Sequence, residues 1–502
     1  MLRYVMLAGA GCALVSLFLP VAHPRPEGLD IPLAVWVAGL AAAVALARAG
    51  FRAAAVLCGG AVLVGVGIAL VVDVGHGLPA PDVPVLAVGA LAVAVGAGWW
   101  GTTWRPTALG ALAVVPVVGL ALVAPALADH AAVRSHVREA WAEPAAPVAE
   151  TPGDRRWTWQ PPGRVLRLVP AGHGVAVVTT WGVITGVVDG RAEWTYARSG
   201  ADVADVRTSA DLRTLVVAFR GAANDENTLV VVLDADTGAV RFQRPVRSPR
   251  LWAGTRSLIE AEAGTVTAYD VVSGDVRWRR DSVEGCRTAD LAGVGRTVAV
   301  VRPGCTDRDG LVGLSEDTGD VVWSTLTPFA PGLDLPRRPS TRAKATPTGG
   351  AVLVERSGDR PPGVGDTAVL DTLTGKVTEA SYPGMYRLDV GALPIVVPRS
   401  ENLRDPIRLI DPVSGVVRDV QDDCKIFNTA ATGTRTLLRV CHDGERLEVR
   451  TDGVDGTTTG TRVPELEREH GVVAQVAATP GAVVVTGFGT DGVVLPVVGL
   501  AR

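Results

Sequence analysis

Few residues in the C-terminal two thirds of the chain have the chemistry of a catalytic site. The histidines of this region are three and lie far apart in the sequence: His173, His442 and His470. No Gly-x-Ser-x-Gly turn lies near them, and the chain contains no Walker A loop or dinucleotide-binding fingerprint. General acid–base catalysis would therefore depend on carboxylates in loops. The sequence assigns no catalytic residue.

Acidic residues cluster at three places that border polar loops: Asp225-Glu226, Asp307–Asp309 and Asp422-Asp423. Such clusters are typical of solvated turns. The alternative is a calcium site in the loop at 222–228 or 306–310, because carboxylates and the amide of Asn227 suit a hard cation. The pattern selects no ligand set, and we predict no metal site.

Cysteines form two pairs with separations of 19 and 17 residues: Cys286 and Cys305, and Cys424 and Cys441. Each pair would lie on two neighbouring antiparallel strands, where the two side chains face each other as a disulfide requires. Zinc binding is the alternative, but there is no Cys-x-x-Cys pair and only His442 is near. We predict disulfides Cys286–Cys305 and Cys424–Cys441, which implies an oxidising, non-cytoplasmic compartment. Cys12 and Cys58 fall in apolar segments and are interpreted as packing residues.

The elements that would position these residues repeat along the chain. In each repeat an apolar strand ends in Asp, two variable residues and Ser or Thr follow, and Gly precedes a second strand. The copies are Asp234–Gly238, Asp270–Gly274, Ser315–Gly319, Asp371–Gly375 and Asp411–Gly415, after a shortened one at Val188-Asp189-Gly190. Their glycines recur at a mean spacing of about 45 residues, which is typical of propeller blades.

The chemistry of this repeat is that of a tight turn. The Asp side chain accepts backbone N–H groups of the turn, Ser or Thr does the same, and Gly supplies the positive φ. Four residues after the glycine, the first four copies carry an aromatic residue: Trp194, Phe242, Trp278 and Trp323. Glu379 and Asp419 stand at that position in later copies.

These residues resemble the tryptophan-docking motif of the pyrroloquinoline-quinone-type (PQQ-like) β-propeller repeat family. The resemblance covers about residues 161–502, and it implies an all-β, eight-bladed propeller in which each aromatic residue packs between adjacent blades. Blades of four strands and about 43 residues account for this length. Residues 155–160 look like an isolated outer strand, and we expect them to complete the last blade and close the ring.

The N-terminal quarter has a different character. Five apolar runs, at 4–22, 31–47, 53–72, 83–100 and 107–127, are each long enough to cross a bilayer as a helix. We therefore predict a transmembrane bundle at 1–128 and a juxtamembrane linker with the closing strand at 129–160, of which 129–141 extends the last helix as a stalk. A signal peptide, or a lipid-modified Cys12, is the alternative for the first run.

Arginines predict the orientation of this bundle. With the N-terminus inside, the cytoplasmic side carries Arg3, Arg48, Arg52 and Arg105, and the outer loops carry Arg25 alone. The propeller is then extracytoplasmic, on a multi-pass protein of the cell membrane. No charged residue lies in the middle of a run, which favours an anchor over a transport pathway.

Taken together, the sequence predicts a non-catalytic binding, sensing or scaffolding module for a protein or polar ligand of the cell envelope. The expected contacts are the long loops of the propeller at 221–228, 303–310, 328–345, 356–366 and 399–406. The net charge of −4 argues against nucleic acid as a partner.

The alternative to a binding module is a membrane-bound quinoprotein dehydrogenase for sugars or alcohols, with PQQ and calcium. The resemblance to those enzymes includes five N-terminal spans, but their vicinal cysteines and large insertions are absent here. No cofactor is predicted.

Overall fold

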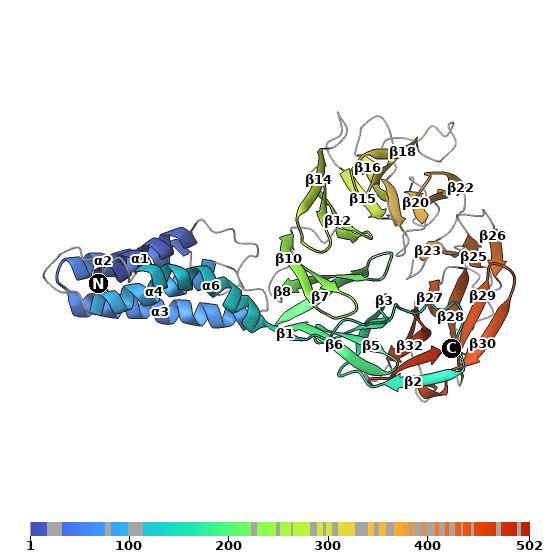
Figure 1. Ribbon diagram of the computed structural model, residues 1–502, viewed down its shortest axis with the longest axis horizontal. Helices are drawn as coiled ribbons and strands as arrows, with labels where there is room; N and C mark the ends of the chain where they lie inside the picture. The colour runs from blue at the N-terminus through green and yellow to red at the C-terminus, as the bar shows by residue number, and fades with distance from the viewer. Residues whose placement is uncertain are drawn as a thin grey trace.

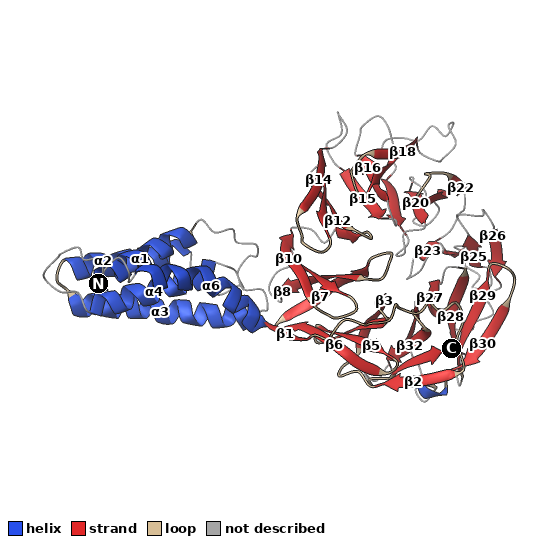
Figure 2. Cartoon of the chain, viewed as in Figure 1, coloured by secondary structure: helices blue, strands red, loops and turns tan. Residues whose placement is uncertain are grey.

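The computed structural model shows an elongated molecule with a helical bundle at one end and a ring of β-sheets at the other (Figure 1). It describes residues 2–502 except 18–32, 76–81, 99–113, 222–227, 247–250, 263–264, 282–288, 295–297, 304–309, 327–339, 346–350, 358–365, 381–384, 388–394, 398–406, 411–416, 421–426, 433–434, 443–445, 468–472 and 489–492. Helix and strand are almost completely segregated along the chain (Figure 2).

Five described helices coincide with the five apolar runs. They are α1 (Leu2–Ser16), α2 (Leu33–Arg48), α3 (Arg52–Gly75), α4 (Asp82–Gly98) and α6 (Val114–Ala132). Small residues allow α1 and α4 to approach closely: a Cβ atom added to Gly9 would lie 2.7 Å from the Cβ of Ala92, and Gly89 faces Ala13 in the same way. These pairs show that α1 and α4 run antiparallel.

One of the described helices is long and apolar enough to cross a membrane by itself, with a span at Ala53–Val71 of α3. The other apolar helices are shorter: Tyr4–Ser16, Val35–Arg48, Asp82–Val95 and Pro116–Ala132. Length and composition therefore indicate one span. The multi-pass topology and its orientation remain predictions.

The strands follow the bundle in a regular order. They are β1 (Val133–His136), β2 (Arg155–Trp159), β3 (Val165–Ala171), β4 (Gly174–Thr179), β5 (Val183–Val188), β6 (Arg191–Arg198), β7 (Ala201–Thr208), β8 (Thr214–Gly221), β9 (Thr228–Asp234), β10 (Val240–Val246), β11 (Leu251–Ala253), β12 (Ser257–Glu262), β13 (Thr265–Asp270), β14 (Val276–Asp281), β15 (Ala289–Val294), β16 (Val298–Pro303), β17 (Gly310–Ser315), β18 (Val321–Leu326), β19 (Ser340–Ala345), β20 (Ala351–Ser357), β21 (Asp366–Asp371), β22 (Val377–Ala380), β23 (Met385–Arg387), β24 (Ile395–Val397), β25 (Ile407–Ile410), β26 (Val417–Val420), β27 (Phe427–Thr432), β28 (Thr436–His442), β29 (Leu447–Gly453), β30 (Thr458–Arg462), β31 (Val473–Thr479), β32 (Ala482–Phe488) and β33 (Val497–Ala501). A short 3₁₀ helix occupies Pro464–Leu466.

The described strands form eight antiparallel sheets, each built from consecutive strands except the first and the last along the ring. Neighbouring sheets touch mainly through the first strand of each: β31 with β27 and β3, β3 with β7, β7 with β11, and β15 with β11 and β19. These are the inner strands, and the outer strands lie on the perimeter (Figure 1). The arrangement is a propeller-like β domain that follows an N-terminal helical region.

The expected closing strand is confirmed. β2, at 155–159, pairs antiparallel with β33, with Trp157 opposite Gly499, and forms the outer edge of a sheet with β33, β32 and β31. The last sheet therefore combines the C-terminus of the chain with a strand that precedes the first sheet, which removes a free end from the ring.

The prediction that residues 129–141 extend the last helix as a stalk is wrong. Helix α6 ends at Ala132, and Val133–His136 form β1, which pairs with β6 as a fifth strand of the first sheet. The outer edge of β6 offers unpaired backbone groups that β1 satisfies, whereas an isolated helix extension would have no packing partner. Residues 137–151, called the strap below, then run along the ring to β2.

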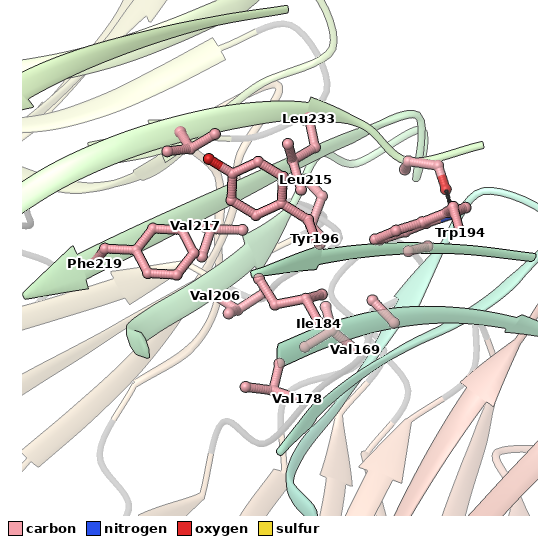
Figure 3. Packing of buried hydrophobic residues seen from close by; sticks show 14 of the residues in the cluster. Val169, Val178, Ile184, Trp194, Tyr196, Val206, Leu215, Val217, Phe219 and Leu233 are labelled. Atoms are coloured by element: carbon pink, nitrogen blue, oxygen red, sulfur yellow. Dashed lines mark hydrogen bonds between the residues drawn. The ribbon is translucent and has the colours of Figure 1, made fainter. Parts of the chain in front are cut away.

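Apolar side chains fill the spaces between neighbouring sheets. Between the first and second sheets, Trp194 and Tyr196 of β6 pack with Val206 of β7 and Phe219 of β8 (Figure 3). The Tyr196 and Phe219 ring centroids are 5.8 Å apart at a tilted angle. Burial between sheets, more than hydrogen bonding within them, holds adjacent sheets together.

Candidate functional site

The repeated turn has the hydrogen bonds expected from its sequence. Asp234 accepts the backbone N–H groups of Asp236 and Thr237 and the Thr237 hydroxyl, each at 3.0 Å. Asp270 accepts two backbone N–H groups in the same way, and Asp371 accepts one N–H group and the Thr374 hydroxyl. The Asp of the motif therefore shapes the turn.

These contacts change the acidity of the turn carboxylates. Burial acts to raise the pKa of Asp234, but the hydrogen bond and charge of Arg241, together with Thr237, outweigh it and hold that pKa below its usual value. The backbone N–H of Ser273 is the main cause that lowers the pKa of Asp270. Both carboxylates are therefore stabilised in the ionised form.

In four consecutive sheets, the aromatic residue that follows the turn docks on the turn of the next sheet. The indoles pack on the glycines and donate N–H to a carbonyl of that turn: Trp194 on Gly238 with Ala235 O at 3.1 Å, Trp278 on Gly319 with Glu316 O at 2.8 Å, and Trp323 on Gly375 with Thr372 O at 2.9 Å. Phe242 packs on Gly274 without a hydrogen bond. A Cβ atom at these glycines would lie under 3.0 Å from the ring, and their φ is positive, so both space and backbone conformation favour glycine.

Trp157 of β2 makes the corresponding contact at the closure of the ring, with its Cβ 3.1 Å from the Cβ position of Gly190. The turn it meets is the shortened one, in which Asp189 and Gly190 have φ of 47° and 79° and connect β5 directly to β6. The carbonyl that accepts the other indole N–H groups is missing from this turn. The buried indole N–H of Trp157 consequently has no acceptor among the described residues.

Two repeat residues, Asp411 and Gly415, lie outside the described residues. In the fourth copy, Ser315 stands in place of Asp and its hydroxyl accepts the N–H of Thr318 at 3.4 Å. Next to it, Glu316 is almost fully buried and accepts the backbone N–H groups of Arg256 and Ser257 in the preceding sheet. Burial raises the pKa of Glu316 despite these hydrogen bonds. This copy therefore connects adjacent sheets through a carboxylate as well as through an indole.

Of the four cysteines in the two predicted disulfides, the structure describes Cys441. Cys286, Cys305 and Cys424 lie outside the described residues, and no two described cysteines are bonded to each other. Cys441 is buried in β28 and is disulfide-bonded, while Cys12 and Cys58 are free thiols. Both pairings therefore remain predictions.

The two histidines of the ring that the structure describes, His173 and His442, belong to different sheets. His470 lies outside the described residues, and His442 ends β28. His173 is in the turn between β3 and β4, where its Nε2–H donates to the carbonyl of Glu143 at 2.8 Å and Nδ1 lies 2.6 Å from Asp236. Trp141 of the strap stacks on its ring at 4.8 Å. The contacts of His173 thus hold the strap on the ring.

Within the described residues, no group of three His, Cys, Asp or Glu side chains is placed to hold a metal ion. The loops proposed above for calcium or for partner contact fall largely in the ranges that are not described. Their roles stay predictions.

The connection between bundle and ring is the arrangement that the sequence did not indicate. Asp129, in the last turn of α6, forms an ion pair with Arg198 of β6, whose side chain is fully buried. The second oxygen of Asp129 accepts the Gln243 amide of β10 at 2.7 Å, and Gln243 also accepts Arg198 at 3.2 Å. Burial raises the pKa of the neighbouring Tyr196 phenol to about 12. These groups, called the junction below, bind the helix to two sheets at once.

Nothing in the local sequence marks this junction, because Asp129, Arg198 and Gln243 are 69 and 45 residues apart. The strap likewise contains no motif. Of these contacts, the sequence indicated only that of Trp157, because Trp157-Thr158-Trp159 has the alternating aromatic and polar pattern of an outer strand.

The chain is similar to several solved structures at low sequence identity. Among solved structures, BamB from Moraxella catarrhalis is 13% identical with a TM-score of 0.38, over 68% of this chain and 99% of that one. Quinohemoprotein alcohol dehydrogenase ADHIIG from Pseudomonas putida HK5 is 13% identical with a TM-score of 0.39, over 71% and 78%. The WD40 domain of SCAP from fission yeast is 8% identical with a TM-score of 0.39, over 68% and 96%. No curated protein matches the chain.

A family model gives the more specific result. Residues 251–382, which contain the turns at Gly274, Gly319 and Gly375, match the PQQ-type repeat model described as outer membrane protein assembly factor BamB. The resemblance inferred from the turn motif is thereby confirmed, and over residues 251–382 this chain carries the BamB-like, PQQ-type β-propeller repeat.

Proposed function

We propose that this chain is a multi-pass membrane protein whose eight-bladed propeller lies outside the cytoplasm. There it acts as a non-catalytic binding or scaffolding module for a protein or polar ligand of the cell envelope. The matching family model is described as an assembly factor of the outer membrane, and this supports a role in holding other proteins.

The junction is the observation that carries the proposal. Helix α6 passes into β1 without a spacer, and Asp129 is held between Arg198 and Gln243 of two different sheets. A flexible tether would let the ring rotate freely, whereas this connection holds it in one orientation to the bundle. A fixed orientation suits a module that presents a surface to a partner.

The direction of the helices supports the proposed topology. Because successive helices alternate in direction, α1, α3 and α6 run toward the ring, and α2 and α4 run away from it (Figure 1). Arg48 at the end of α2 and the start of α3 at residue 52 therefore lie at the end remote from the ring. Asp82, at the start of α4, lies at the near end. An arginine-rich remote end is expected on the cytoplasmic side.

A reporter that is active only outside the cytoplasm, fused after residue 160, tests the topology. We expect activity there and no activity for the same reporter fused at residue 50, between α2 and α3. The reverse result would reject the proposed orientation.

Dye reduction tests the binding role against the dehydrogenase alternative. The purified full chain, given PQQ, calcium and a panel of sugars and alcohols, should neither retain quinone stoichiometrically nor reduce the dye. Photo-cross-linking in intact membranes should instead capture a discrete partner from positions on the ring. Quinone uptake with substrate-dependent dye reduction would reject a non-catalytic role.

A further inference from the structure

The outer edge of a sheet in this ring can take a further strand. In the first sheet, β1 pairs antiparallel with β6 along Val133–His136, so backbone groups at the edge of β6 have partners. In the other sheets the outermost strand is β10, β14, β18, β22, β26, β30 or β2, and no described strand pairs with its outer side. Such an edge presents backbone N–H and C=O groups with which another chain can pair.

Charged side chains protect most of these outer strands against pairing. β14 contains three arginines and an aspartate, and β10 contains two arginines and a proline. β2, β22, β26 and β30 each contain at least one charged residue as well. Charges and proline on an exposed edge are the features with which native proteins prevent the addition of a foreign strand.

The exception is β18, at Val321–Leu326. It consists of two valines, a tryptophan, a serine, a threonine and a leucine, so it has no charge, no proline and no glycine. Most of these residues are of the β-branched and aromatic types that favour strands. Val321 is 46% exposed, Val322 is 53% exposed, and Ser324 is exposed as well. β18 is therefore an apolar edge strand without the protection that the other outer strands have.

Trp323 fixes the position of this edge. Its indole packs over Gly313 of β17 and over Gly375 in the turn that follows β21. The indole N–H donates to the carbonyl of Thr372 in the same turn at 2.9 Å. The strand is thus held by its own sheet and by the next one. A strand that binds to a preorganised edge has to order only itself, which lowers the entropic cost of binding.

The helical bundle leaves this edge accessible. Figure 1 shows β18 on the perimeter of the ring, on a different side from the one where the bundle joins it. The bundle is attached through β1, β6 and β10, which belong to the first two sheets. A membrane crossed by the bundle would therefore not cover β18.

The chemistry of the edge indicates which strand fits it. β-Branched or aromatic side chains are favourable cross-strand neighbours for Val321 and Val322. A charged side chain beside them would lose water without gaining a counter-ion. A second copy of this chain has a strand of that kind, but in the proposed topology its own bundle must lie in the same membrane, which restricts its approach. A strand of a different protein has no such restriction.

We propose that the outer edge of β18 is a strand-addition site for an extended, uncharged segment of a partner protein that is rich in β-branched residues. Backbone hydrogen bonds to β18 would extend its four-stranded sheet to five strands, as β1 does for the first sheet. This inference rests on the proposed binding role, and it adds the surface and the kind of partner.

Binding of a fluorescein-labelled peptide of alternating threonine and valine to the full chain in detergent, followed by fluorescence anisotropy, tests the chemistry. We expect saturable binding that salt does not weaken, because no charges are involved. A peptide in which proline replaces every valine should not bind, since proline has no N–H group for the ladder.

Lysines on the edge test its position. Val322→Lys combined with Ser324→Lys should weaken peptide binding by roughly tenfold. Val276→Lys is the matched control, because Val276 is 59% exposed at the start of the neighbouring outer strand β14, and it should leave the affinity unchanged. Equal affinity in these two variants, or no binding of the threonine–valine peptide to the unchanged protein, would overturn the proposal.

Hydrogen exchange locates the bound peptide. Backbone amides within Val321–Leu326 should exchange more slowly when the peptide is present, while those of β14 should not change. Protection of another outer strand in place of β18 would show that the site is elsewhere.

A photo-cross-linking amino acid at position 322 of the full chain in membranes separates this inference from the proposed function. We expect adducts with a different protein that the threonine–valine peptide displaces. Adducts at twice the mass of this chain would identify a second copy and overturn the proposal. No adducts from 322, with partner adducts from other positions on the ring, would reject the β18 site but leave a binding role standing. No adducts from any position would count against both.

Discussion

Asp129, in the last turn of α6, and Arg198, at the end of β6, form an ion pair that joins the helical bundle to the ring, and the Arg198 side chain is completely buried. The pair matters because a buried guanidinium is costly without its partner. Since Asp129 also holds Gln243 of the second sheet, one carboxylate fixes the helix to two sheets.

Asp129→Ala should therefore destabilise the ring beyond the effect of losing a surface charge. We expect a loss of about 3 kcal/mol in the free energy of unfolding, measured by denaturant titration of the full chain in detergent. Arg155→Ala, which removes the 65% exposed partner of Asp189, serves as the control and should change stability by less than about 1 kcal/mol. Similar losses in the two variants would show that the junction is not a buried, specific contact.

The indoles of Trp157 and Trp194 differ in one hydrogen bond. Trp194→Phe removes the N–H that Ala235 O accepts and should cost about 1 kcal/mol, in addition to the smaller ring. Trp157→Phe removes an N–H that has no acceptor among the described residues, so the smaller ring is its main cost. Thermal unfolding of the two variants should rank Trp194→Phe as the less stable. The opposite ranking would mean that the shortened turn supplies an acceptor after all.

The closing strand should be necessary for a stable ring. A soluble chain that begins at Gly163 lacks β2, so it exposes the edge of β33 and the apolar surface that Trp157 and Trp159 cover. We expect it to melt at a lower temperature, or to aggregate, compared with a chain that begins at Thr151. Identical melting temperatures would contradict closure through β2.

Acid should weaken the turns of the repeat. The folded pKa of Asp234 lies below its ordinary value of 3.8, so its carboxylate contributes stability above that pH and loses it as the pH falls through the folded value. Asp234→Asn should lower the melting temperature near pH 7, and the difference from the unchanged protein should shrink as the pH is lowered below 3.8. Asp275→Asn, at an exposed position of a neighbouring turn, is the control. A difference that is constant with pH would exclude a role for the Asp234 charge.

Two disulfides should be present in the protein isolated from an oxidising compartment. Non-reducing peptide mapping should recover Cys286 with Cys305 and Cys424 with Cys441, each closing a short loop worth roughly 2–4 kcal/mol if unstrained. The bonded state of Cys441 agrees with one of them. Free thiols at positions 286 and 305, or a different partner for Cys441, would refute the corresponding pairing.

The local sequence was sufficient to predict the turns and the closing strand. Asp234, Gly238 and Trp194 act through contacts that recur at fixed spacing, because a turn is made by neighbours and the docking geometry recurs in four consecutive sheets. Apolar run lengths located the five helices for the same reason, since a helix and its apolar face are local properties. The sequence alone thus determined the repeat, the ring and the helical region before it.

Only the tertiary structure decided how these parts meet. The pairing of Asp129 with Arg198 and the path of the strap over His173 each join residues that no spacing relates. Residues 133–136 became a strand because the edge of β6 was free to pair, which their own sequence does not record. Contacts between distant segments depend on the packing of whole sheets, and packing is a property of the folded chain rather than of any one segment.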